Sequence, residues 1–262
     1  MREMKLQELK AKTPAELVSF ARHYLGLYHY QRNELAVAEK YLMPLVMQPY
    51  VLHAMCFLNS SVLLARIRQA QNQPEEARAI VDALLSLALE IGDGAILSDA
   101  RAFQAELALR QGRLAEASQW AAQYGSFRPG PMPFVFSPPI ALAQILIAQD
   151  TPASRQQARH LLAQLDDYNT SIHYTVIRIQ VLALQALLHQ AEGNELQALA
   201  ALSNSIALAE PGGFIRLFVD LGEPLERLLT TLVREKAGSS YAAQILAAFP
   251  QTFSPVAAHR QA

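Results

Sequence analysis

The feature that most constrains this chain of 262 residues is an internal repeat with a period of about 40 residues. Each of the five copies has an apolar stretch, a short polar turn and a second apolar stretch. A small residue in the first stretch precedes an alanine in the second by 12, 12, 12, 15 and 12 residues, and these alanines recur at intervals of 39, 40, 41 and 40. The pairs are Gly26 with Ala38, Ala65 with Ala77, Ala105 with Ala117, Ala143 with Ala158 and Ala186 with Ala198. Such a period is typical of solenoids, in which one supersecondary unit stacks on the next.

Small residues at these positions indicate antiparallel helical hairpins. Two helices joined by a short turn can approach closely only where their facing side chains are small. Asn72, Thr151 and Asn194 stand where they can cap the second helices, and Pro74 fits a first helical turn. Each hairpin alone would expose an apolar face, so neighbouring hairpins must stack. We therefore predict an all-α superhelical array of about five to six antiparallel hairpins.

Composition and charge exclude several classes of protein. Hydrophobic residues make up 52% of the chain, which is too many for a disordered segment. Lys and Arg number 22 against 23 Asp and Glu, so the chain lacks the basic excess that direct contact with nucleic acid requires. The single cysteine, Cys56, lies in an apolar stretch and is expected to be an inert core thiol. No unbroken apolar run is long enough to span a membrane, and we expect a cytoplasmic protein.

Motifs for catalysis, cofactors and metals are absent from the sequence. The seven histidines show no H-x-x-x-H or H-E-x-x-H spacing, which a helical zinc site would need. No G-x-x-x-x-G-K-[ST] loop could hold phosphates, and no serine stands in a nucleophile elbow. We expect a protein that is not an enzyme and that has no catalytic residue, cofactor or metal site.

Two segments depart from the plain repeat pattern. Gly125 to Pro139 interrupts the helical rhythm, and we predict an ordered surface loop packed by Phe134 and Phe136. Trp120, in a second helix, is expected to lie in the core. Phe214 to Leu221 fits the period of a strand and that of a helix.

The turn residues around that ambiguous segment favour a sixth, degenerate helical unit. Gly222 is placed to end one helix and Pro224 to start the next. Arg216, Asp220 and Glu223 are predicted to form a salt-bridge network that fixes the turn between them.

The segment LAEPGGFIRLFVDLGEPLERLL, from Leu208 to Leu229, carries the most specific signal. Together with the preceding LQALLHQAEGNELQALAALSNSIALAEP, it closely resembles the tetratricopeptide-like repeat domain of MalT-like, LuxR-type ATP-dependent transcriptional regulators. The matching residues are Gly213, Phe214, Arg216, Leu217, Phe218, Asp220, Gly222, Glu223 and Leu228. The resemblance implies one repeat domain over residues 1–236, with 208–236 as its family-specific end. Residues 237–262 would be a C-terminal helix or tail leading toward a DNA-binding domain that the chain does not contain.

The resemblance also implies a function. Such a domain would sense a signal in a bacterial transcriptional regulator, binding an inducer or a partner on its concave face and controlling self-association. The alternative is a constitutive tetratricopeptide-like scaffold that binds a peptide or a partner protein.

Candidate binding residues follow from the geometry of tetratricopeptide-like arrays, in which the first helix of each unit lines the inner surface. This geometry places on the concave face His23, Tyr30, Asn59, Arg66, Gln69, Asp99, Glu106, Arg110, Gln144, Gln180 and Gln190. The lining is amide-rich and of mixed charge, which suits a small polar inducer such as an oligosaccharide, or an extended peptide, rather than phosphate. A solvated helix face would carry the same residue types without binding anything.

Overall fold

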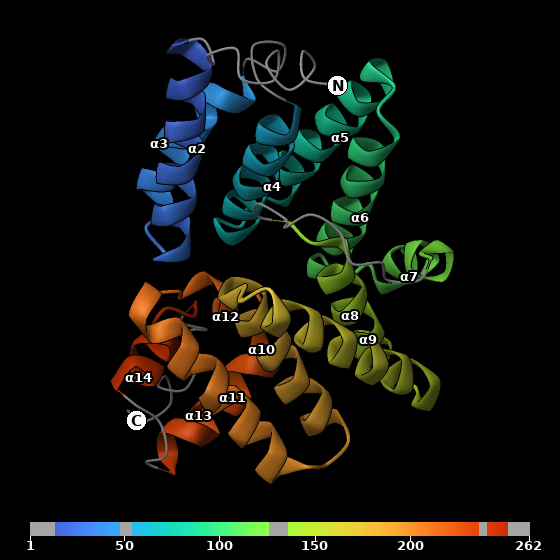
Figure 1. Cartoon of the computed structure of the whole chain (residues 1–262), viewed down its shortest axis with the longest axis vertical. Helices are drawn as coiled ribbons and strands as arrows, with labels where there is room; N and C mark the ends of the chain where they lie inside the picture. The colour runs from blue at the N-terminus through green and yellow to red at the C-terminus, as the bar shows by residue number, and fades with distance from the viewer. Residues whose placement is uncertain (1–13, 48–53, 126–135, 236–239, 251–262) are drawn as a thin grey trace, which may run out of the picture.

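The computed structural model describes residues 14–47, 54–125, 136–235 and 240–250. Within these ranges the regular secondary structure is helical and contains no strand, and the helices pack in sequence as hairpins (Figure 1). The five hairpins are α2 (Pro14–Gln31) with α3 (Leu35–Val46), α4 (Ala54–Ala70) with α5 (Pro74–Ile91), α6 (Gly94–Arg110) with α7 (Leu114–Gln123), α8 (Pro138–Gln149) with α9 (Pro152–Ser171), and α10 (Thr175–Ala191) with α11 (Glu195–Ala209). The prediction of an all-α array of helical hairpins is confirmed.

The segment after the fifth hairpin is also helical, as predicted. It contains η2 (Glu210–Gly212), α12 (Arg216–Val219) and α13 (Glu223–Arg234), which we call the C-terminal unit, and it is followed by α14 (Ser240–Ala247). Gly222 separates α12 from α13 with a φ of 71°, a backbone conformation that glycine adopts without strain. The helical interpretation of residues 214–221 is therefore correct.

The small repeat residues lie where the paired helices touch. The nine alanines of the repeat are at most 3% exposed. Gly26 lies so close to α3 that a Cβ atom at this position would stand 2.6 Å from Cδ2 of Leu42. Side-chain size at these positions therefore sets how closely the helices approach.

We expect Gly26→Ala to lower the free energy of unfolding by about 1 kcal/mol. Overpacking against the fully buried Leu42 costs about 1–3 kcal/mol, and alanine recovers about 1 kcal/mol of helix propensity. Gly94→Ala is the matched control, because its Cβ would meet no heavy atom within 4 Å. Urea denaturation should show a loss for Gly26→Ala alone, and a gain in both variants would contradict the close contact.

The helix caps follow the sequence prediction only in part. Thr151 caps α9, since its Oγ1 accepts from the Ser154 amide at 3.1 Å while Ser154 Oγ accepts from the Thr151 amide at 3.0 Å. Asn194 precedes α11 without capping it through its side chain. The prediction for Asn72 is wrong, because Gln73 is the residue before α5 and Asn72 adopts a left-handed φ of 60° in the turn. Asparagine tolerates that conformation and therefore forms the turn instead of the cap.

Most of the predicted loop, residues 126–135, lies outside the described residues, but Phe136 near its end packs against the core. Phe136 is buried, its ring lies 5.5 Å from that of Phe103, and its amide donates to Asn59 Oδ1 at 3.3 Å. Phe134 lies outside the described residues. Trp120 is half-buried and packs against two apolar clusters, so it lies at the edge of the core and not fully inside it.

The array curves until its two ends meet, which the sequence did not predict. The C-terminal unit returns to the end of α2 beside the first hairpin (Figure 1). The amide of Ile215 donates to the carbonyl of Gln31 at 2.7 Å, and Arg32 Nη2 lies 3.5 Å from the carbonyl of Gly212. We call this contact, between residues 30–33 and 212–220, the terminal junction.

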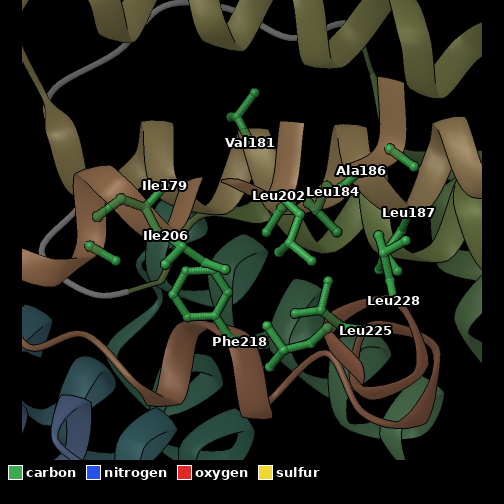
Figure 2. Packing of buried hydrophobic residues seen from close by; sticks show 14 of the residues in the cluster. Ile179, Val181, Leu184, Ala186, Leu187, Leu202, Ile206, Phe218, Leu225 and Leu228 are labelled. Carbon is green, nitrogen blue, oxygen red and sulfur yellow. The ribbon is translucent and has the colours of Figure 1, made fainter. Parts of the chain in front are cut away.

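The main apolar core holds the C-terminal unit against the later hairpins only. This core draws on residues from Ile140 to Phe249, and Figure 2 shows Phe218, Leu225 and Leu228 facing side chains of α10 and α11. The first hairpin belongs to a separate apolar cluster. The terminal junction is therefore held largely by polar contacts. Among the described helices, none combines the length and apolar character needed to cross a membrane.

Candidate functional site

A cavity of about 1440 Å³ lies on the inner surface of the array. One wall comes from α4, α6, α8 and α10, the first helices of four successive hairpins, and the opposite wall comes from the C-terminal unit. Five of the predicted concave-face residues line it, and these are Arg66, Gln69, Arg110, Gln144 and Gln190. The structure thus brings together side chains from helices that are about 40 residues apart in the chain.

The other six predicted residues do not line this cavity, and they are His23, Tyr30, Asn59, Asp99, Glu106 and Gln180. His23 is buried, and its Nδ1 lies 3.0 Å from Ser60 Oγ of α4. Asn59 is buried and donates from Nδ2 to the carbonyl of Met55 at 2.7 Å. Asp99 and Gln180 are half-buried elsewhere on their helices.

Tyr30 and Glu106 instead belong to a buried charged network behind the cavity wall. Arg66 donates to both carboxylate oxygens of Glu106, from Nε at 3.0 Å and from Nη2 at 2.8 Å. Arg110 donates from Nε to the same carboxylate at 2.9 Å and from Nη1 to the carbonyl of Asp220 at 3.0 Å. The network therefore joins α4 and α6 to the C-terminal unit.

Asp220 connects this network to the terminal junction. Its carboxylate accepts from the hydroxyl of Tyr30 and from the guanidinium of Arg216. Arg216 also donates from Nη1 to Asn33 Oδ1 at 3.2 Å, in the turn after α2. The predicted pair of Arg216 with Asp220 is confirmed. The predicted participation of Glu223 is wrong, because its exposed carboxylate pairs with Arg227 one helical turn away, at 2.8 Å.

The network keeps its carboxylates ionised. Burial alone would raise the pKa of Asp220, but Arg216, Arg110 and Arg66 outweigh it and hold this pKa below its usual value. Arg66 and Arg110 lower the pKa of Glu106 in the same way against the effect of burial. Burial and the charge of Asp220 raise the pKa of Tyr30, so that its phenol stays neutral and donates its proton to Asp220.

His23 and Asp99 give opposite pH dependences of stability. Burial lowers the pKa of His23 to about 4, whereas burial and then the charge of Asp93 raise the pKa of Asp99 to about 6. As pH falls from about 6.5 to about 4, the unfolded chain binds a proton at His23 that the folded chain excludes, which removes about 3 kcal/mol of stability. As pH falls through about 6, the folded chain binds a proton at Asp99 before the unfolded chain does, which adds stability.

We therefore expect two substitutions to change the pH dependence in opposite directions. Relative to wild type, His23→Gln should become more stable as pH falls from about 7 to about 4.5, and Asp99→Asn should become less stable. Urea unfolding of the three proteins at both pH values measures this. Parallel changes in all three proteins would contradict the assignment.

The described residues contain no group of three or more His, Cys, Asp or Glu side chains that could hold a metal ion. Cys56 is buried, and burial raises the pKa of its thiol, which disfavours the reactive thiolate.

Stacked helical hairpins with small residues at each contact define the chain as a helical repeat protein of the tetratricopeptide type. Its sequence matches the MalT-like TPR region over residues 2–235, and the chain belongs to this family. The predicted resemblance is thereby confirmed. The comparison with curated proteins gives no match. The family region is a non-catalytic repeat fold that implies a protein-interaction scaffold.

The wall contributed by the C-terminal unit is the part of the site that the sequence prediction missed. Arg216, Asp220, Glu226 and Arg227 line the cavity, whereas the sequence predicts only a turn-stabilising role for the first two and no role for the last two. The density of charged residues between 216 and 227 was the available signal. It could not reveal that this segment folds back onto the concave face.

Proposed function

We propose that this chain is the signal-sensing and protein-interaction region of a MalT-like bacterial transcriptional regulator. It binds a small polar inducer in the cavity and thereby controls self-association of the regulator. One observation carries the proposal: the cavity lies between the first helices of four hairpins and the C-terminal unit. A ligand there touches both the array and the segment that completes it.

Amide groups in the cavity support a polar ligand. Among the described residues, the side chains of Gln144 and Gln190 make no hydrogen bond, and Gln69 uses only its Oε1, which accepts from Gln111 at 2.9 Å. Each amide offers donors and an acceptor. The half-buried side chains of Leu109 and Ile147 add apolar surface to the cavity. This combination suits a ligand with hydroxyl or amide groups and an apolar face, such as an oligosaccharide or a short peptide.

The polar terminal junction supports a mechanism of signalling. Because the C-terminal unit forms both a cavity wall and one side of the junction, a ligand that prefers one arrangement of this unit shifts the balance between two packings of the array. The surface offered to another copy of the regulator changes with that packing.

Calorimetric titration with a panel of sugars, nucleotides and peptides tests the proposal, with sedimentation velocity as the readout of self-association. Gln190→Ala should weaken binding of an identified ligand about tenfold, the loss expected for about 1.4 kcal/mol of hydrogen bonding. Gln180→Ala, on the same helix but away from the cavity, is the matched control and should bind as wild type does. Equal losses in both variants, or no ligand and no self-association, would contradict the proposal.

The alternative function, a constitutive scaffold for a peptide or partner protein, has its own support. Helix α2 exposes Leu17, Val18, Tyr24, Leu25 and Tyr28. An apolar surface of this kind is typical of contacts between proteins. A defined partner that binds equally with and without small molecules would favour this alternative.

A further inference from the structure

The buried network beside the cavity carries an excess of positive charge. The guanidinium groups of Arg66, Arg110 and Arg216 face two carboxylates, those of Glu106 and Asp220. Arginine stays protonated in proteins. One positive charge of the network therefore has no counterpart within it.

None of the other described acidic residues that line the cavity forms an ion pair with an arginine of the network. Asp150 pairs with Arg155 at 3.1 Å and Glu223 pairs with Arg227 at 2.8 Å. The carboxylate of Glu226 forms no ion pair within the described part of the chain. An uncompensated charge in a buried site is costly unless a bound group neutralises it.

Two guanidinium groups in this wall also have unused donors. The side chain of Arg216 is only 8% exposed, and its Nε has no hydrogen-bond partner but is itself closed to solvent. Arg66 uses Nε and Nη2 on Glu106, and its Nη1 makes no hydrogen bond to any described residue. Both residues line the cavity. Buried donors are rarely left unpaired, and a forked guanidinium matches the geometry of a carboxylate or phosphate.

We propose that the ligand of this cavity carries an oxyanion, a carboxylate or a phosphate group, which binds at the free Nη1 of Arg66 and neutralises the excess charge of the network. The inference rests on the function proposed above and gives its inducer a chemical class. It modifies the expectation from sequence, which favoured a neutral polar ligand over phosphate. The amide-lined part of the cavity then holds the uncharged remainder of the ligand.

Thermal unfolding in the presence of simple anions tests this inference without knowledge of the natural ligand. Inorganic phosphate and acetate represent the two oxyanion classes, with sodium chloride added to keep the ionic strength constant. We expect at least one of them to raise Tm saturably, by about 3 °C at ten times its Kd. The anion that acts at the lower concentration identifies phosphate or carboxylate as the preferred group. Absence of a saturable rise with either anion would overturn the inference.

Variants separate a specific site from the general effect of anions on protein stability. Arg66→Gln removes the excess charge and should abolish the saturable rise. Arg178→Gln removes a half-buried guanidinium that lies outside the cavity and should keep it. If Arg66→Gln does not fold, Arg66→Lys is the second variant, because it keeps the positive charge but lacks the forked guanidinium group. The anion concentration that gives half of the Tm rise should then increase about tenfold. A rise that persists unchanged in the Arg66 variant, or that disappears equally in Arg178→Gln, would overturn the inference.

Titration with neutral sugars distinguishes the two proposals. A neutral sugar that binds in the cavity, with no response to either anion, would overturn the anionic inference and leave the sensing function supported. Anion binding that depends on Arg66 but has no effect on self-association would support the inference and contradict the proposed control of assembly.

Discussion

Replacing Asp220 by alanine is expected to lower the free energy of unfolding by about 3–5 kcal/mol and Tm by about 10 °C. The carboxylate of Asp220 faces Arg216 and Arg110 and accepts the hydrogen bond of Tyr30. Without it, two buried guanidinium groups lose an opposite charge and the phenol loses its acceptor. Removal of one partner from a buried ion pair costs much more than the pair contributes relative to an apolar replacement.

Glu223→Ala provides the matched control for Asp220→Ala. Glu223 lies three residues further along the same turn, and its ion pair with Arg227 is exposed to solvent. Its loss should change stability by less than about 0.5 kcal/mol. Urea denaturation monitored by circular dichroism measures both variants. A loss below about 1 kcal/mol for Asp220→Ala would mean that solvent screens the network and that it does not hold the junction.

The second large effect is expected for Phe218→Ala, with a loss of about 3–5 kcal/mol. Phe218 is fully buried in the main core, where its ring points toward Ile206 and lies near Leu225 (Figure 2). Truncation leaves a cavity that the surrounding helices can fill only in part. The C-terminal unit should therefore detach from α10 and α11 at lower temperature than the hairpins unfold.

Leu196→Ala is the control for loss of apolar side-chain volume. Leu196 lies on α11 and is 86% exposed, so its truncation should have almost no effect on stability. Differential scanning calorimetry of both variants measures the change in Tm and any separate transition of the C-terminal unit. A loss below about 1.5 kcal/mol for Phe218→Ala would contradict the packing of α12 against the last hairpin.

The hairpins could be predicted because the physical signal that forms them is local. Gly26 and the repeat alanines report the close approach of two helices joined by a short turn, and the turn lies within the same segment of sequence. Pro74 and Gly222 mark helix boundaries through backbone conformations that depend little on tertiary contacts. The structure therefore contains these helix contacts and helix boundaries as predicted.

The site could be predicted only in part, because a side chain on the inner face of the array does not always reach the cavity. Gln144 of α8 and Gln190 of α10 lie on the inner face of the array, and both line the cavity. Tyr30 and Glu106 are covered by the returning C-terminal unit and neighbouring helices, so they serve a buried network instead. The contact of Tyr30 with Asp220 joins residues 190 positions apart, and a repeat pattern contains no information about such a distant pairing.

The central claim, that the two ends of the array meet and thereby complete the cavity, is tested most directly by hydrogen exchange at the amide of Ile215. This amide donates to Gln31 across the terminal junction, so its protection reports the junction alone. We predict exchange at least about a hundredfold slower than in a free peptide, and a selective loss of that protection in Asp220→Ala while amides within α8 to α11 stay protected. Exchange of the Ile215 amide at the rate of an unstructured peptide in the wild-type chain would contradict the account.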